Sequence, residues 1–296
     1  MSVESNARML IVPGSIPGKV MQGLTGTGEQ LVAEGRIHHH RRIAAPDGTE
    51  IDVWVINSRL YHHADDGSAQ PIRRGTVVLL HPLLASKSWF LPLAEKLADA
   101  GWDAVLIDNR AHGRSAGKYI TWGAKEKHDV KAVMDALLAD GTVCPAIYAM
   151  GASMGGAVAI QYAALDPRCR GVLAVAPPAD ARRPCRGILL MASPGRFEAA
   201  FRRAGEIADF DPDSASAVAA ASHLTCPLLL VHGIWDVIVP YRHSRDILRA
   251  AAGGGKLQPL YLKGHAAEIG MEDWLVTRMG ILAEMGRQKQ RGPEHD

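Results

Sequence analysis

A serine between two glycines is the most specific chemical signal in the sequence. Gly151, Ser153 and Gly155 form a G-x-S-x-G sequence between the apolar run 146–150 and an Ala-rich stretch that begins at Met154. This order predicts a sharp turn from a strand into a helix, where the glycines avoid collisions and the serine hydroxyl points outward. The start of a helix also favours negative charge that develops nearby. The pattern therefore indicates a nucleophilic serine.

Such a serine needs a base, and the base needs a carboxylate that orients it, because a hydroxyl is a weak nucleophile at neutral pH. Asp236 follows the apolar run 227–231, and His265 follows the run 257–262. Ligands of open parallel sheets bind at the carboxyl ends of the strands, so we expect Ser153, Asp236 and His265 to converge there. Other acids that compete for the orienting role are Asp180, Asp211 and Asp213. We prefer Asp236 because only it follows a clear strand.

Acyl transfer also needs hydrogen-bond donors for the oxyanion of the tetrahedral intermediate. The backbone N–H of Met154 is one such donor, since it directly follows the serine. The loop after the run 76–80 reads His81-Pro82-Leu83. Proline has no N–H, so Leu83 is predicted to supply the second donor.

Unbroken apolar runs alternate with helix-like segments from residue 76 onward. The runs are 76–80, 104–107, 146–150, 171–175, 227–231 and 257–262, and the helical segments are 89–101, 124–140, 154–165, 241–252 and 271–287. Strands that are apolar on both faces belong to parallel sheets covered by helices. Two alternating stretches within 29–60, around the turn 46–48, add an antiparallel strand pair. The alternation predicts an α/β fold with a doubly wound, mostly parallel, eight-stranded sheet.

A long interval after the sixth predicted strand breaks this rhythm. Phe197 and Phe201 recur at helical spacing within it, which predicts a short inserted helical cap. The resulting division is an N-terminal arm at 1–28, a catalytic domain at 29–177 and 225–287, a cap at 178–224, and a polar tail at 288–296. The Gly- and Pro-rich arm is expected to be irregular or to lie along the surface.

Charge and cysteine content exclude several classes of function. The 33 Lys and Arg residues nearly balance the 31 Asp and Glu residues, so nucleic-acid binding is not expected. Four cysteines at wide spacing, with no CxxC pair, favour reduced thiols in a cytoplasmic protein over a zinc site or a disulfide framework. The apolar run near the N-terminus is too short for a signal peptide or a membrane span. No metal site is predicted, since adjacent histidines at 38–40 would alternate between the two faces of a strand.

Over residues 30–287 the chain resembles the serine-hydrolase branch of the α/β hydrolases, which contains serine aminopeptidase-like, monoacylglycerol lipase-like and general esterase members. The resemblance rests on the glycine–serine turn, the loop 108–115, the order serine, acid, histidine, and the stretch from His232-Gly233 through Asp236 to Val239-Pro240. The usual His-Gly of the oxyanion loop is His81-Pro82 here. The resemblance implies that Ser153 is acylated by an ester, thioester or amide and freed by water, without a cofactor.

The expected activity is a serine esterase that acts on a small-molecule ester with a small to medium acyl group. Trp235, Met191, Phe197 and Phe201 are predicted to form the apolar substrate pocket. One alternative is an aminopeptidase or amidase, in which cap carboxylates would hold an amine; those acids are Glu198, Glu206, Asp209 and Asp211. A C–C bond hydrolase, a perhydrolase and a non-catalytic ligand-binding protein are further alternatives.

Overall fold

An eight-stranded sheet with the order β1-β2-β6-β5-β7-β8-β9-β10 forms the centre of the molecule. The computed structural model describes residues 1–15, 27–63, 67–261, 264–265 and 271–291. The strands of the sheet are β1 (His39–Ala44), β2 (Glu50–Ile56), β5 (Thr76–Leu80), β6 (Asp103–Ile107), β7 (Ile147–Ala152), β8 (Cys169–Val175), β9 (Leu228–Gly233) and β10 (Gly255–Leu260). β2 pairs antiparallel with β1 and β6, and the other pairings within the sheet are parallel. The predicted mostly parallel eight-stranded sheet is confirmed.

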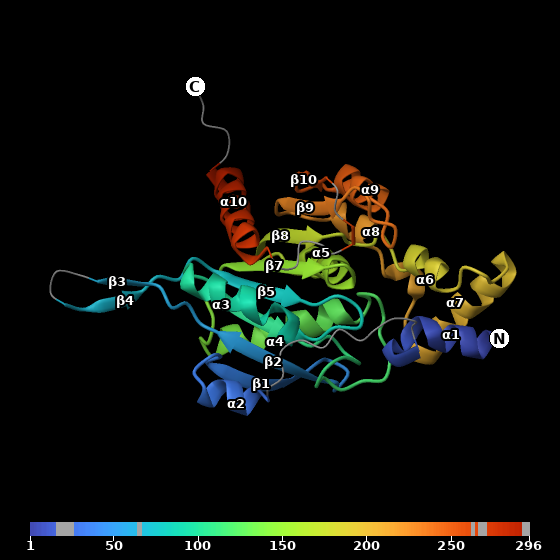
Figure 1. Cartoon of the computed structure of the whole chain (residues 1–296), viewed down its shortest axis with the longest axis horizontal. Coiled ribbons are helices and arrows are strands. Elements are labelled where there is room, and N and C mark those ends of the chain that lie inside the picture. The colour runs from blue at the N-terminus through green and yellow to red at the C-terminus, as the bar shows by residue number, and fades with distance from the viewer. Residues whose placement is uncertain (16–26, 64–66, 262–263, 266–270, 292–296) are drawn as a thin grey trace, which may run out of the picture.

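Helices cover both faces of the sheet, as a doubly wound fold requires (Figure 1). They are α3 (Leu91–Asp99), α4 (Glu126–Ala139), α5 (Met154–Leu165), α9 (Arg242–Ala250) and α10 (Glu272–Arg291). In β5, Val78 and Leu80 pack in one apolar core with α4 and α5, whereas Val77 and Leu79 pack in the other with α3 and α10. Each central strand is therefore buried on both sides, which explains its unbroken apolar sequence.

The cap lies between β8, the sixth strand of the sheet along the chain, and β9. It contains α6 (Arg182–Ile188), α7 (Pro194–Ala208) and α8 (Ala217–Ala221). Phe197 and Phe201 lie one turn apart on the buried face of α7, as their spacing predicts. Figure 1 shows α6 and α7 at one end of the molecule, beside the carboxyl ends of the strands.

The N-terminal segment differs from the irregular arm that we expect from its sequence. Residues Val3–Ile11 form helix α1, which packs against α7 of the cap (Figure 1). The Ser2 hydroxyl accepts a hydrogen bond from the Ser5 N–H and so caps the helix. Ala7, Leu10 and Ile11, at helical spacing, are buried against the cap. Residues 16–26 of the predicted arm lie outside the described residues.

Two further elements were not predicted. Helix α2 (Gly28–Ala33) occupies the start of the stretch expected to form a strand, because Thr27 and Gln30 form a capping box. A hairpin of β3 (Tyr61–His63) and β4 (Ala69–Pro71) extends from the end of the molecule opposite the cap (Figure 1). Its strands are short and exposed, so they carry no alternating apolar signal.

The C-terminal helix extends further than its sequence suggests. α10 continues to Arg291, so the first residues of the predicted polar tail are helical, while 292–296 lie outside the described residues. Among the helices of the described part of the chain, none combines the length and the apolar character that crossing a bilayer requires.

Candidate active site

Ser153 lies at a strained turn between β7 and α5. Its φ of 50° and ψ of −121° place a non-glycine residue in a rarely occupied region. A Cβ on Gly151 would lie 2.3 Å from the Gly155 carbonyl oxygen, and one on Gly155 would lie 2.0 Å from the Leu80 carbonyl oxygen. Both contacts are with backbone, which cannot move aside. The two glycines are therefore steric requirements of the turn.

The structure brings together the three residues that the sequence nominates for catalysis. His265 Nε2 lies 3.0 Å from Ser153 Oγ, and His265 Nδ1 lies 2.7 Å from Asp236 Oδ2. These residues follow β10, β7 and β9, whose carboxyl ends lie at the same edge of the sheet. The imidazole therefore connects the hydroxyl with the carboxylate by two hydrogen bonds.

Asp236 is buried, and its second oxygen is held by the backbone. Oδ1 accepts hydrogen bonds from the N–H groups of Ile238 at 2.9 Å and Val239 at 2.8 Å. Burial raises the pKa of Asp236, but hydrogen bonds with His232 and His265 outweigh this effect, so the pKa lies well below its usual range. The group is thus a carboxylate at neutral pH and favours a proton on the nearby Nδ1 of His265.

His232 supports the loop that carries Asp236. Its Nε2 lies 2.8 Å from the Val239 carbonyl oxygen, and its Nδ1 lies 2.7 Å from the Ser244 hydroxyl. A carbonyl only accepts hydrogen bonds, so Nε2 carries the proton and Nδ1 accepts from Ser244. The same Nε2 is 3.3 Å from Asp236 Oδ2. A buried histidine at the end of β9 therefore orients both the loop and its carboxylate.

His81 holds the loop that the sequence nominates as half of an oxyanion hole. Its Nδ1 lies 2.8 Å from the Pro82 carbonyl oxygen, and its Nε2 accepts a hydrogen bond from the Asn109 N–H at 3.0 Å. Burial lowers the pKa of His81 to about 3, so the ring is neutral. The two contacts select the tautomer with the proton on Nδ1.

This arrangement directs the Leu83 N–H. The Pro82 carbonyl oxygen accepts from His81 and also from the Ala85 N–H at 3.2 Å. In a trans peptide the N–H points away from the C=O. The Leu83 N–H therefore points away from His81, and the Leu83 side chain packs against the cluster that contains Met154. Met154 is the first residue of α5, where an N–H has no acceptor within the helix.

A buried lysine anchors the end of the same loop. Lys87 Nζ lies 2.5 Å from both Asp52 Oδ1 and Asp108 Oδ2, and the Lys87 N–H donates to Asp108 Oδ1 at 2.7 Å. Burial raises the pKa of Asp108, but the charge and hydrogen bonds of Lys87 together with the His81 ring outweigh this effect, so the pKa lies below its usual value. Sequence reasoning missed Lys87, since a loop lysine is ordinarily solvated. It missed the role of His81 as well, although the position of this histidine directly after β5 was a usable signal.

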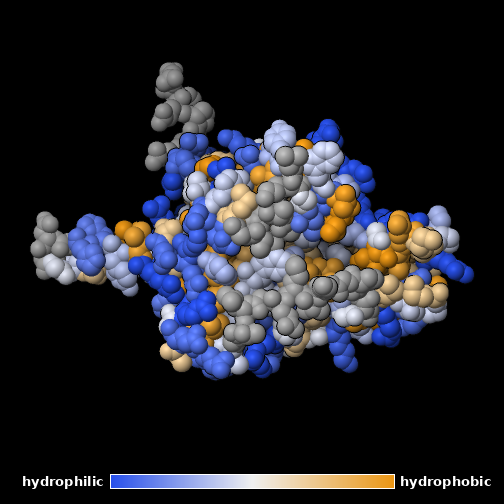
Figure 2. Space-filling model, in the orientation of Figure 1, coloured by the Kyte–Doolittle hydropathy of each residue, from blue (hydrophilic) through white to orange (hydrophobic). Residues whose placement is uncertain are grey.

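The four residues predicted to form the acyl pocket do not line a common cavity in the described part of the chain. Phe197 and Phe201 stack with ring centroids 5.5 Å apart and are buried in the cap core with α1. Met191 is 96% exposed and Trp235 is 64% exposed. Figure 2 shows apolar residues at the cap end of the molecule, on its surface. Phe197 and Phe201 therefore pack the core of the cap. Their helical spacing is compatible with this role as well as with a pocket wall.

The competing acids have other partners in the cap. Asp180 accepts from the Arg183 N–H at 2.9 Å, and Asp213 pairs with Arg182 at 2.9 Å. Asp211 accepts from the Asp213 N–H at 3.0 Å. Of the four acids that the sequence offers, Asp236 is the one that lies within hydrogen-bonding distance of His265. In the described residues, no group of three His, Cys, Asp or Glu side chains is placed to hold a metal ion.

The fold and a family model identify the class of the protein. The esterase Pf2001 of Pyrococcus furiosus superposes with a TM-score of 0.64 at 20% identity, covering 90% of this chain and 98% of that one. A family model described as serine aminopeptidase, S33, matches residues 71–203. This chain has the α/β-hydrolase fold.

Two curated proteins are similar to this chain in sequence. The hydrolase is 26% identical over 214 residues to the monoacylglycerol lipase of Mycolicibacterium smegmatis, a match that covers 60% of this chain and 76% of the lipase. It is 31% identical over 88 residues to YqkD of Bacillus subtilis, and this match spans 30% of this chain and 29% of YqkD. The hydrolase is therefore similar to enzymes of the esterase and lipase type.

Proposed function

We propose that the protein is a serine carboxylester hydrolase, which cleaves esters of small to medium acyl groups through an acyl-enzyme on Ser153. The observation that carries this proposal is the pair of hydrogen bonds from His265, at 3.0 Å to Ser153 Oγ and at 2.7 Å to Asp236 Oδ2. A nucleophile, a base and an orienting carboxylate in this geometry are the requirements of acyl transfer to a serine.

The first half of the reaction forms the acyl-enzyme. Ser153 Oγ attacks the ester carbonyl carbon while its proton passes to His265 Nε2. The carbonyl oxygen becomes an oxyanion, which accepts hydrogen bonds from the N–H groups of Leu83 and Met154. As the tetrahedral intermediate collapses, His265 gives the proton to the leaving alkoxide, and an alcohol departs.

The second half releases the acid. Water attacks the acyl-enzyme, His265 takes a proton from it, and the same N–H groups stabilise the second oxyanion. Collapse returns the proton to Ser153 Oγ. Throughout, the Asp236 carboxylate accepts a hydrogen bond from His265 Nδ1 and stabilises the imidazolium. The low pKa of Asp236 keeps this group ionised for that role.

Contacts in the cap favour an ester over an amino-acyl amide. An aminopeptidase requires a free carboxylate for the substrate's amine. The four acids considered for that role each have a partner: Glu198 with Arg182 at 2.6 Å, Glu206 with Arg203 at 2.8 Å, Asp209 with Lys125 at 3.3 Å, and Asp211 with the Asp213 N–H at 3.0 Å. Three of these carboxylates face a cationic side chain, and Asp211 accepts from a backbone N–H, so each acid already has a partner with which a substrate ammonium group would compete.

The decisive experiment combines covalent labelling with ester turnover. Wild type should react with a fluorophosphonate probe at Ser153 and hydrolyse p-nitrophenyl butyrate, and Ser153→Ala should lose labelling and more than about 10⁴-fold in kcat/KM. Ser193→Ala is the matched control, because Ser193 is exposed in the cap and should leave both readouts unchanged. Retention of a tenth of wild-type turnover in Ser153→Ala would overturn the proposal. Faster turnover of a matched amino-acyl amide than of its ester would assign an amidase instead.

A further inference from the structure

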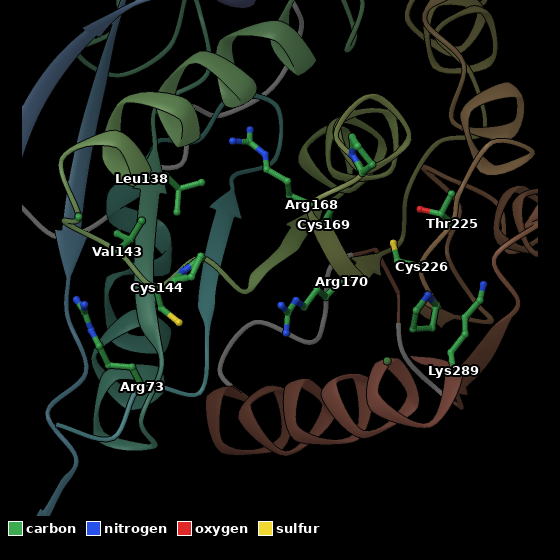
Figure 3. Close-up of a pocket in the computed structure, with 15 residues that line it drawn as sticks. Arg73, Leu138, Val143, Cys144, Arg168, Cys169, Arg170, Thr225, Cys226 and Lys289 are labelled. Atoms are coloured by element: carbon green, nitrogen blue, oxygen red, sulfur yellow. The ribbon is translucent and has the colours of Figure 1, made fainter. Parts of the chain in front are cut away.

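A second cluster of nucleophilic side chains lies at the opposite end of the sheet from Ser153. Three of the four cysteines, Cys144, Cys169 and Cys226, line one cavity of about 970 Å³ at the amino ends of β7, β8 and β9 (Figure 3). These three strands are neighbours in the sheet. The sequence spacing hides this grouping, because the thiols come from three different strand starts.

Two of these thiols are placed to react with each other. Cys169 begins β8 and Cys226 precedes β9, and the Val172 N–H donates to the Pro227 carbonyl oxygen at 3.0 Å, which sets the two segments side by side. Both side chains are buried in the same apolar cluster, so they lie on one face of the sheet. Both are free thiols, and each affects the pKa of the other; the Cys169 Sγ donates to the Gly171 carbonyl oxygen at 3.5 Å. Adjacent strands lie about 4.8 Å apart, which falls within the Cα separations that disulfides span.

The surroundings distinguish the two thiols chemically. The neighbouring Cys169 thiol lowers the pKa of Cys226 against the opposing effect of burial, and the charge of Lys289 acts in the same direction as Cys169. The Cys226 thiol, together with burial, raises the pKa of Cys169 well above its usual value. Figure 3 shows Arg170 and Lys289 on either side of Cys226 in this view, and the described residues of the cavity lining include basic but no acidic side chains. Cys226 is thus the better nucleophile and Cys169 the thiol that remains protonated.

We infer that Cys169 and Cys226 form a redox pair, which a peroxide that enters the cavity converts into an intrachain disulfide. The Cys226 thiolate attacks one peroxide oxygen, the O–O bond breaks, and the products are a Cys226 sulfenic acid and, after protonation, water or an alcohol. The Cys169 sulfur then attacks the sulfenic sulfur, and its proton leaves with the hydroxyl as water. With hydrogen peroxide, two thiols give one disulfide and two waters. A dithiol restores the reduced pair by exchange.

The bridge has a predictable effect on the fold. The chain between the two cysteines contains β8 and the whole cap, so the bridge joins the two ends of the cap-bearing segment. A disulfide across a long loop restricts the unfolded chain and stabilises the folded one. Because the pair lies at the amino ends of strands whose carboxyl ends carry Ser153 and Asp236, oxidation should leave basal ester turnover unchanged. The inference stands independently of the proposed function.

The test uses the full chain, hydrogen peroxide and thiol counting. After oxidation and denaturing alkylation, the mass of the wild type should show two fewer alkylated cysteines, and peptic digestion should yield a peptide that links Cys169 to Cys226. Trypsin is unsuitable, since Arg168 and Arg170 flank Cys169. The thermal midpoint should rise on the order of 5 °C, and dithiothreitol should reverse both changes.

Single variants assign the two roles. Cys169→Ser should trap a Cys226 sulfenic acid that dimedone labels, whereas Cys226→Ser should show little labelling at Cys169. Cys144→Ser is the matched control, because it removes a thiol from the same cavity and should still form the bridge. A wild type that retains all four thiols, or that links Cys144 instead, would overturn the inference. Both outcomes are read in the wild type, so they do not depend on how the variants fold.

Discussion

The two ends of the same strands carry different chemistry under different constraints. At the carboxyl ends of β7 and β9, Ser153 and Asp236 sit in turns set by backbone contacts, including a positive φ and two N–H groups on one carboxylate. At the amino ends, Cys144 and Cys226 each precede a proline that leads into the strand. The chemistry at the carboxyl ends, here called the polar end, depends on the direction of hydrogen bonds. The chemistry at the amino ends, here called the thiol end, depends on how close the starts of neighbouring strands lie to each other. Substitutions should therefore affect the two ends separately.

The largest effect is expected at the polar end. Asp236→Asn preserves the shape of the side chain but removes the charge that stabilises the imidazolium and selects the tautomer of His265, so kcat should fall about 10⁴-fold. Steady-state kinetics with p-nitrophenyl butyrate measure this loss. Asp180→Asn is the control, because Asp180 contacts Arg183 in the cap and should have little effect on kcat. Equal losses in the two variants would remove Asp236 from the mechanism.

A smaller loss is expected from the residue that orients the Leu83 N–H. His81→Ala frees the Pro82 carbonyl and should lower kcat about 100-fold with a small change in KM, because the oxyanion exists only in the transition state. His81→Asn places an amide N–H near the former Nδ1 and should recover part of kcat. A higher KM with an unchanged kcat in His81→Ala, or no recovery of kcat in His81→Asn, would contradict this positioning role.

His81 also predicts a pH dependence of stability. Its folded pKa of about 3 lies below the unfolded value of about 6.5, so the unfolded chain binds more protons between these values. The stabilisation of the folded state by neutral His81 is fully present above pH 6.5. It is lost as the pH falls towards 3, at up to about 1.4 kcal/mol per pH unit. Urea unfolding of wild type and His81→Asn from pH 7 to pH 4 should show a flatter profile for the variant. Parallel profiles would show that His81 is not buried as a neutral ring.

The smallest effect is expected at the thiol end. Lys289→Gln removes a positive charge that favours the Cys226 thiolate and should slow disulfide formation about threefold. Ester turnover should be unchanged, since the charge lies at the amino ends of the strands. Lys118→Gln, an exposed substitution in a loop outside this cavity, controls for net charge. A parallel loss of turnover in Lys289→Gln would show that the two ends are coupled.

The central strands and helix α5 could be predicted because each leaves a pattern within a few consecutive residues of the sequence. Helix α5 begins at Met154 as predicted, and the buried strands β5 to β9 appear as apolar runs in the sequence. The order of Ser153, Asp236 and His265 after three strands was enough to nominate residues that the structure places within hydrogen-bonding distance. Strand identity follows from burial on both faces, which leaves a direct trace in residue types.

Features that depend on contacts between distant segments could not be predicted in the same way. The buried apolar residues of helix α1 are Ala7, Leu10 and Ile11, and a helix this short depends on its packing against the cap. The spacing of Phe197 and Phe201 is compatible with either a pocket wall or a packed core. The positions of α1 and α6 show that both side chains belong to a packed core. Lys87 is buried because Asp52 and Asp108 meet it from two other elements.

The sequence by itself determined the alternation of the buried strands β5 to β9 with helices, the strand–turn–helix at Ser153 and the residue types at the strand ends. These are properties of periodicity, glycine sterics and burial, which act over a few residues. Only the tertiary structure decided that His81 directs the Leu83 N–H, that His232 supports Asp236, and that Cys169 meets Cys226. Hydrogen bonds and thiol contacts act over a few ångströms, and the fold alone brings residues so far apart in the chain within that range.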